Sequence, residues 1–474
     1  MVLLLLSACT ASPSPAPVPA PAPPRTNIVF VLTDDLTPDL LRFMPHTRAL
    51  AADGTTFTEY TVTDSLCCPS RASILSGKYP HNTGVFTNTA PDGGIAVFRS
   101  RGMDRSTFAT DFQRAGYRTA LYGKYLNGYT TRSGHIAPGW TDWAVPGAAG
   151  YGQFGYDMLE NGTVVRYGHR PQDYLTDVLS AKTRAFVRDS AAARQPFLVT
   201  VSTISPHRPY TPAPRDAGRY PGLTAPRGPA FDRPPTAAPR WLSIRHPLTP
   251  AERARLDAAY RTRAQSVRAV DRLIGDLRAT LTRAGVAGDT VVVFSSDNGY
   301  HLGEHRLMPG KQTAFDHDIH VPLIMAGPGI PESEVDAPAE NIDLRPTFAA
   351  LAGLPAPLDA DGRSLSKVLG GAEPADWRTT ALVEHHGPTD DPADPDFPSP
   401  RSGNPPTYTA IRTPAWTWIE YTGGFREYYN RVRDPHQLRN IASALPPARR
   451  AALHRRLTAL AACRGPAACH AAGG

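Results

Sequence analysis

NIVFVLTDD, residues 27–35, is a run of apolar and β-branched residues that ends in two aspartates. A second stretch, TVVVFSSDNG at 290–299, repeats this arrangement and carries Asp297 and Asn298 at its end. Short apolar runs of this kind are typical of strands that are buried on both faces of a parallel sheet. We therefore expect two buried parallel strands, each with polar side chains at its carboxyl end.

Three further runs have the same character: YRTALYGKY at 117–125, FLVTVSTISPH at 197–207 and VPLIMAGPG at 321–329. Helical patterns separate them, the clearest at 251–284. Strands that alternate with helices predict an α/β fold with a large, mostly parallel sheet flanked by helices. Ligands bind such sheets beyond the carboxyl ends of the strands. Six polar side chains should converge there: Asp34, Asp35, Lys124, His207, Asp297 and Asn298.

Two regions stand apart from this alternation. DMLENGTVVRYG at 157–168 predicts a hairpin with an Asn161-Gly162 turn, which we expect to be an inserted ribbon outside the central sheet. From about Thr379 shorter strands and a helix at 446–461 predict a smaller C-terminal α+β domain with an antiparallel sheet. The predicted division is a leader and tether at 1–24, a catalytic domain at 25–375 and the small domain at 376–474. The proline-rich stretch 385–406 is a candidate lid or specificity loop.

The first residues predict export. A short apolar run leads to Leu6-Ser7-Ala8-Cys9, which resembles the lipobox of bacterial lipoproteins, and a Pro/Ala-rich tether follows it. The resemblance implies a lipid on Cys9 and a cell-surface lipoprotein; the alternative is an ordinary secretory signal and a secreted protein. Because export implies an oxidising environment, we expect Cys463 and Cys469 to form a disulfide.

Charge gives one further signal. The chain has 50 basic and 43 acidic residues without any block of like charge, so the sequence does not indicate nucleic-acid binding. Only five of the basic residues are lysines, and each is therefore informative: Lys78, Lys124, Lys182, Lys311 and Lys367.

The carboxylates at the strand ends indicate a metal site. An isolated Asp-Asp pair is commonly a helix cap, but Asp34-Asp35 and Asp297-Asn298 end two separate strands. Together they offer only oxygen ligands, which favours calcium or magnesium over zinc.

SLCCPSRASILSGK, residues 65–78, places two cysteines side by side. A disulfide between neighbours would be strained, whereas two small buried hydrophobic residues would be ordinary. Pro69-Ser70-Arg71 predicts the start of a helix, so Cys67 should lie at the positive end of its dipole, where anions bind and nucleophiles are activated.

The pattern Cys67-Cys68-Pro69-Ser70-Arg71 resembles that of the formylglycine-dependent sulfatases, which belong to the alkaline-phosphatase-like superfamily. Further blocks match in order over nearly the whole mature chain, among them VLTDD, YGKYLNGY, SPHRP, SSDNGYHLGEH and GKQTAFDHDIHVPLIMAGPG. The branch that is similar to the glucosamine-6-sulfatases is nearest in character. The resemblance implies hydrolysis of a sulfated carbohydrate or an aryl sulfate.

The resemblance also assigns the site. Cys67 would be oxidised to formylglycine (3-oxoalanine) by a formylglycine-generating enzyme and would bind one Ca²⁺ together with Asp34, Asp35, Asp297 and Asn298. Arg71, Lys124, His207 and Lys311 would surround the sulfate. Asp297 would activate the attacking hydroxyl, and His207 or Lys311 would protonate the leaving oxygen.

One departure affects this assignment. Many relatives carry a histidine two or three residues after the lysine of the GK block, where this chain has Leu126 and Asn127. Asparagine cannot act as a base. The base for the elimination step, in which sulfate leaves residue 67 and the aldehyde re-forms, therefore stays open, as do the roles of His301 and His305. Two other functions also stay open: a phosphonate or phosphate ester hydrolase, and a surface protein that binds sulfated glycans without turnover.

Overall fold

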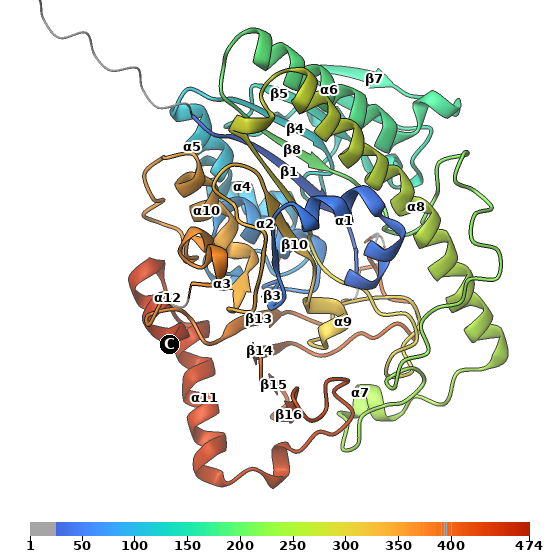
Figure 1. The fold of residues 1–474 in the computed structure, drawn as a ribbon. Coiled ribbons are helices and arrows are strands. Elements are labelled where there is room, and N and C mark those ends of the chain that lie inside the picture. Colours follow the sequence, from blue (N-terminus) through green and yellow to red (C-terminus); the bar gives the residue numbers. More distant parts are fainter. Residues whose placement is uncertain (1–24, 373, 390, 393, 395, 400) are drawn as a thin grey trace, which may run out of the picture.

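The computed structural model describes residues 25–474 apart from 373, 390, 393, 395 and 400, so Cys9 and the expected tether lie outside the described residues. A ten-stranded sheet forms the centre of the molecule (Figure 1). Its strands, in spatial order, are β11 (Ser333–Val335), β2 (Thr55–Phe57), β10 (Leu323–Ala326), β9 (Thr290–Ser296), β1 (Asn27–Thr33), β8 (Phe197–Ser202), β4 (Arg118–Gly123), β5 (Asp142–Pro146), β6 (Asp157–Glu160) and β7 (Thr163–Arg166).

The middle of this sheet is parallel, as predicted. β1 pairs in parallel with both β9 and β8, and β4 pairs in parallel with β8 and β5. The prediction of a parallel strand at 321–329 is wrong, because β10 runs antiparallel to β9. The segment between β9 and β10 holds only the short helix α9 (Asp316–Ile319) and no crossover helix that would return the chain to the opposite edge.

The hairpin of β6 and β7 forms as predicted, with Asn161 and Gly162 at positive φ in its turn. It is not a separate ribbon, however. β6 pairs antiparallel with β5, from Ala144–Glu160 to Pro146–Met158, so the hairpin extends the central sheet at its edge. The free edge of β5 offers backbone groups that a following hairpin can satisfy, and the local pattern does not reveal this.

Alternate residues of β1 face two separate hydrophobic clusters. Phe30 points into the cluster that contains helices α2 (Cys67–Ser76), α5 (Phe108–Arg114) and α10 (Leu344–Leu351). Val29 points into the cluster that contains α6 (Leu175–Ala192) and α8 (Pro250–Arg283). Thr249 caps α8 through a capping box with Glu252, so the helix begins one residue before the predicted start.

The chain ends in a four-stranded antiparallel sheet covered by a helix, as predicted. Its elements are β13 (Ala381–His385), β14 (Tyr408–Arg412), β15 (Trp416–Tyr421), β16 (Arg426–Asn430) and α11 (Pro447–Ala461). A disulfide joins Cys463 to Cys469 at the start of helix α12 (Gly465–Gly473), which confirms the expected bridge.

The remaining elements are short. They comprise β3 (Tyr60–Thr61) and β12 (Ala339–Glu340), which pair with each other, and the helices α1 (Pro45–Ala52), α3 (Pro80–Thr83), α4 (Gly94–Ser100) and α7 (Arg240–Ser243). Among the described residues, no helix combines the length and the apolar character that a membrane crossing requires.

Candidate active site

Helix α2 begins at Cys67, as the sequence predicts. Pro69 lies in the first turn of α2, where backbone N–H groups form no hydrogen bond within the helix, so the missing N–H of proline costs nothing. Gly77 ends the helix in the left-handed conformation. The backbone N–H of Cys68 donates to Asn88 Oδ1 at 3.0 Å. Both cysteines are buried and free, so they do not form a disulfide with each other.

The strand ends bring the predicted polar side chains together. Asp34 and Asp35 follow β1, Asp297 and Asn298 follow β9, and Lys124 follows β4. The pairing in register of Thr33 with Ser296 places the first two pairs side by side. These polar side chains therefore lie together at the carboxyl ends of the strands, as predicted.

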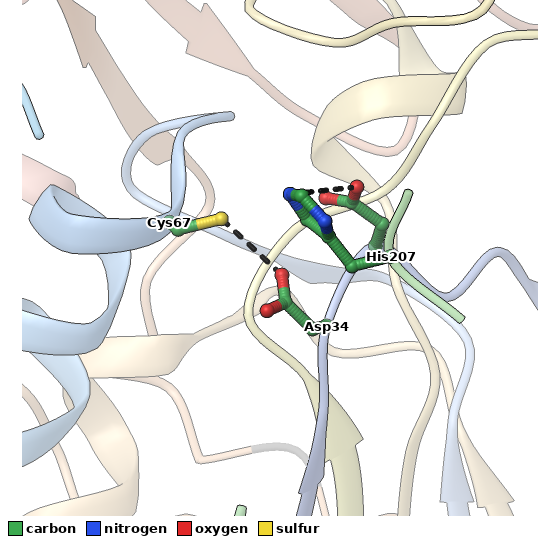
Figure 2. Close-up of side chains that lie close together, drawn as sticks. Asp34, Cys67 and His207 are labelled. Carbon is green, nitrogen blue, oxygen red and sulfur yellow. Dashed lines mark hydrogen bonds and ion pairs between the residues drawn. The ribbon is translucent and has the colours of Figure 1, made fainter. Parts of the chain in front are cut away.

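Cys67 faces this convergence. Its Sγ donates to Asp34 Oδ1 at 3.2 Å and accepts from Lys311 Nζ at 2.8 Å. Figure 2 shows the Cys67 and Asp34 side chains pointing toward each other, with the His207 ring beside them. Lys124 Nζ donates to Asp34 Oδ2 at 2.7 Å. Burial raises the pKa of the Cys67 thiol well above its ordinary value, and the negative charge of Asp34 adds to the effect.

Arg71, one turn after Cys67, bridges two strand ends. Its Nε donates to Asp297 Oδ2 at 2.7 Å, and another guanidinium nitrogen donates to Ser202 Oγ at 2.6 Å. Burial and the nearby Asp34 raise the pKa of Asp297, although Arg71 opposes them. For Asp34 the balance is reversed, because Lys124, His207 and Arg71 outweigh burial and lower its pKa.

The carboxylate and amide oxygens at the strand ends fit a hard cation. Asp34, Asp35, Cys67 and His207 each offer a ligand atom, and these atoms all lie within 4.8 Å of one another. Asp35 Oδ2 and Asn298 Oδ1 are buried without a hydrogen-bond partner, which is costly unless a cation or another donor meets them. Asn298 Nδ2 donates to Asp35 Oδ1 at 2.6 Å, so the amide oxygen is held in a fixed orientation. The cluster contains three of the ligands that the resemblance implied, Asp34, Asp35 and Cys67, and it brings the His207 ring next to them.

Asp396 is a site residue that the sequence reasoning missed. It lies in the loop between β13 and β14, and its Oδ1 is 2.7 Å from His207 Nε2 and 2.8 Å from Lys311 Nζ. Its other oxygen accepts from Asn88 Nδ2 at 2.8 Å. The length and composition of 385–406 indicated that the loop matters, but nothing in the pattern singled out one of its several aspartates.

His301 and His305 have local contacts instead. His301 lies between Asp318, 2.9 Å from its Nδ1, and the carbonyl of Ser402, 2.5 Å from its Nε2. The ring of His305 stacks on Phe315 with centroids 3.9 Å apart. Neither ring forms a described hydrogen bond to the groups around Cys67.

Comparison with known proteins gives consistent matches. The Sulfatase family model matches residues 26–354, and the N-sulphoglucosamine sulphohydrolase C-terminal model matches 303–462. The N-acetylglucosamine-6-sulfatase of Capra hircus is 35% identical over 93% of this chain and 84% of that protein. The arylsulfatase of Volvox carteri is 31% identical over 93% of this chain and 75% of that protein.

A solved structure supports the same assignment. A protein in complex with its substrate D-glucosamine-2-N,6-O-disulfate matches with a TM-score of 0.73 and 25% identity, covering 92% of this chain and 97% of that one. The strand-end carboxylates, the buried cations and Cys67 at the start of a helix therefore occur in a fold and a sequence that are both those of known sulfatases. The chain belongs to the sulfatase family of the alkaline-phosphatase-like superfamily, and it is a sulfuric ester hydrolase.

Proposed function

We propose that this sulfatase removes sulfate from a sulfated sugar or an aryl ester with a nucleophile made from Cys67. The observation that carries the proposal is the position of Cys67: it lies at the N-terminus of α2, and its side chain faces Asp34 and Lys311. Cys68 belongs instead to a hydrophobic cluster. This difference supports Cys67 as the residue that a formylglycine-generating enzyme would convert.

Two groups complete the proposed site. Formylglycine at position 67 would supply, in its hydrated form, a hydroxyl as the attacking group. One Ca²⁺ would supply positive charge to a sulfate oxygen and to the nucleophile, and Asp34, Asp35, Asp297, Asn298 and residue 67 would hold it. The unpartnered oxygens of Asp35 and Asn298 support this assignment.

Side chains around Cys67 would stabilise the sulfuryl transfer and deprotonate the nucleophile. Arg71, Lys124 and Lys311 place three cations around Cys67, where they would offset charge that develops on the transferred sulfuryl group. Asp297 takes up a proton from the nucleophile, and its contact with Arg71 orients the carboxylate.

His207 is placed to supply the proton to the leaving alcohol. Its Nδ1 donates to the carbonyl of Arg208 at 2.6 Å, so Nε2 is the nitrogen that faces the site. A small cavity of about 30 Å³ lies between His207, Lys311, Asp35 and Asp396 and would admit one small group beside this nitrogen. Lys311 is the alternative proton donor.

The relatives support the substrate class and the location. Those matched include N-acetylglucosamine-6-sulfatases and an extracellular sulfatase of Drosophila melanogaster, which is 34% identical over 77% of this chain and 33% of that protein. We infer an exported enzyme that acts on carbohydrate sulfates outside the cell. It would be anchored through a lipid on Cys9 or, failing that, secreted. Its catalytic domain would span 25–375 and its small C-terminal domain 376–474.

The test combines mass spectrometry with a substrate panel. The chain is produced together with a formylglycine-generating enzyme, and the peptide spanning Cys67 and Cys68 should carry an aldehyde at position 67 and a thiol at position 68. Cys67→Ala should abolish sulfate release, whereas Cys68→Ala, the matched control, should retain it. An unmodified thiol at position 67 in active enzyme would refute the proposed nucleophile. Faster turnover of matched phosphonate esters would favour the phosphonate hydrolase, and tight glycan binding without sulfate release would favour the non-catalytic binder.

A further inference from the structure

A second cavity, of about 240 Å³, adjoins Lys124, one of the cations around Cys67. Lys124 and Tyr151 form part of its wall. The ammonium of Lys124 lies 5.1 Å from the centroid of the Tyr151 ring, and the same ring meets the His207 ring edge-on at 4.7 Å. The rim includes Gly128, Thr130 and Ala148, which are exposed, so the cavity opens to solvent. A ligand seated in it would therefore lie next to the sulfate-binding region.

The side-chain amide of Asn127 lines this cavity and has no hydrogen-bond partner among the described residues. Its side chain is 6% exposed, and neither Oδ1 nor Nδ2 forms a hydrogen bond to the described residues. A buried amide that is left unpaired in this way costs free energy, on the order of 1–3 kcal/mol for each missing bond. The other buried amide in the wall is already satisfied, because Asn88 binds the backbone of Cys68 and the carboxylates of Asp394 and Asp396. Asn127 therefore offers one donor and one acceptor to whatever enters the cavity.

The remaining wall defines the chemistry of the ligand. Lys124 is the only charged residue among the described lining residues, and its ammonium is bonded to Asp34 at 2.7 Å. A charged group that entered here would lose its hydration without gaining a free counterion. Pro146, Tyr151 and Ile204 supply apolar surface. The ligand that matches is neutral, has an apolar face and carries a donor next to an acceptor, as adjacent hydroxyls on a pyranose ring do.

We propose that this cavity is a subsite for an uncharged sugar ring of the substrate, and that Asn127 binds a pair of neighbouring hydroxyls on that ring. The inference rests on the proposed carbohydrate sulfatase function. It also gives Asn127 a specific role in the segment where many relatives carry a histidine. Asn127 would determine substrate specificity, and it would not transfer protons.

The test compares two kinds of substrate. The first is the 6-sulfate of N-acetylglucosamine, galactose or glucose, whichever the wild type cleaves best. The second is 4-nitrophenyl sulfate, which carries no hydroxyl pair. Asn127→Leu keeps the branching at Cγ and the number of side-chain heavy atoms, and it removes both hydrogen-bonding groups. It should lower kcat/KM by about 10- to 100-fold more on the sugar sulfate than on the aryl sulfate, mainly through KM.

Control variants separate this result from a folding defect. Tyr129→Phe alters the same wall, but the Tyr129 hydroxyl already binds Trp143 and the carbonyl of His135, so the ratio between the two substrates should stay that of the wild type. Asn127→Ser, which keeps one small polar group, should give an intermediate ratio if the leucine variant folds poorly. Equal losses on both substrates would overturn the subsite while leaving the sulfatase function intact. Absence of sulfate release by the wild type from every sugar would instead overturn the proposed function.

Discussion

His207 is held through both ring nitrogens, and only one of them faces the reaction. Nδ1 donates to the carbonyl of Arg208, and Nε2 lies 2.7 Å from Asp396. If Nε2 protonates the leaving oxygen, His207→Ala should slow poor leaving groups by about 10²- to 10⁴-fold and good ones much less. The measurement is kcat/KM across a series of aryl sulfates of graded leaving-group acidity.

The matched control for this series is His301→Ala. His301 is equally buried, but it is bonded to Asp318 and to the carbonyl of Ser402, so its loss should lower stability without changing how the rate depends on the leaving group. A His207→Ala enzyme that loses the same factor on every ester would assign the proton transfer to another group, with Lys311 next in order.

Asp35 is the residue on which the metal assignment depends most directly. It has a positive φ of 66°, a conformation that strains a residue other than glycine and is common at functional sites. Its Oδ2 is buried, accepts no hydrogen bond and lies 3.8 Å from His207 Nε2. Asp35→Ala should remove bound calcium from the purified protein. In the wild type, calcium at about a hundred times its dissociation constant should raise the free energy of unfolding by about 2.7 kcal/mol, and the variant should lose this increase.

The measurements for Asp35 are metal content and calcium-dependent melting, neither of which requires turnover. Asp39→Ala provides the comparison, because Asp39 lies four residues further on and binds the Tyr260 hydroxyl instead. The assigned ligands would be contradicted if Asp35→Ala retained calcium, or if a chelator left the melting temperature of the wild type unchanged.

At the residue scale, much of the site could be predicted from the sequence, because its members either follow a recognisable strand or belong to a residue type that is rare in this chain. Of the five lysines, Lys311 binds Cys67 and Lys124 binds Asp34, the partner of Cys67. Lys78 and Lys182 form ion pairs with Asp359 and Glu160 instead. Asp396 could not be predicted. It reaches His207 across 189 positions of the chain, and only the path of the folded loop brings the two together.

At the element scale, the strands were predictable where burial sets their composition. β1 and β9 are buried at every position, and a continuous apolar run is the pattern that such strands require. Strand direction was not predictable for β10, because its composition resembles that of the parallel strands in the middle of the sheet and only the connection from β9 decides its direction. The edge position of β6 and β7 depends likewise on the free edge of β5.

The small antiparallel sheet contains a buried carboxyl group whose titration should be visible in stability. Glu427 on β16 accepts from the hydroxyls of Tyr421, at 2.6 Å, and Tyr429, and it has no exposed surface. Burial raises the pKa of Glu427 to about 7, although the two hydroxyls oppose the shift. Because the folded state binds this proton more tightly than the unfolded state, its stabilising effect is complete below the ordinary pKa of 4.5 and is lost as the pH rises through 7.

We therefore expect Glu427→Gln to reduce the pH dependence of stability. Between about pH 5 and about pH 8, the wild type should lose on the order of 3 kcal/mol more unfolding free energy than the variant. Denaturant unfolding at the two pH values measures this difference. Glu420→Gln on β15, whose carboxylate is partly exposed, is the control and should follow the wild type. If the unfolding free energy changed equally with pH in the wild type and in Glu427→Gln, the Glu427 carboxyl would not titrate between these two pH values.

At the scale of the whole molecule, the two sheets are joined by buried contacts. Val62 of the main body shares a hydrophobic cluster with Val383, Tyr408 and Ala410 of the small sheet. The backbone N–H of Glu384 donates to the carbonyl of Thr63, and the ring of His385 lies 3.4 Å from the Asp64 carboxylate. The loop that carries Asp396 leaves β13 and returns to β14, so the small sheet also supports the active site.

The strongest polar link is Arg412, which is 2% exposed. Arg412 binds Glu59 at 2.6 Å and Asp316 at 3.0 Å, and Arg431 adds a second cation to the same two carboxylates. Asp316 lies five residues after Lys311. Any separation of the small sheet from the main body would break these ion pairs and expose the apolar side chains that the two parts share.

We therefore expect the described chain to unfold in one calorimetric transition, with equal calorimetric and van't Hoff enthalpies, although its architecture has two parts. Arg412→Ala should lower the free energy of that single transition by about 3 kcal/mol or more, because removing one partner strands a buried charge. Arg426→Ala on β16 removes an arginine whose contact to Glu420 is 3.6 Å long and partly exposed, and it should cost less than about 1 kcal/mol. Two resolved transitions in the wild type, with activity surviving the first, would show instead that the small sheet unfolds independently and that the loop carrying Asp396 does not depend on it.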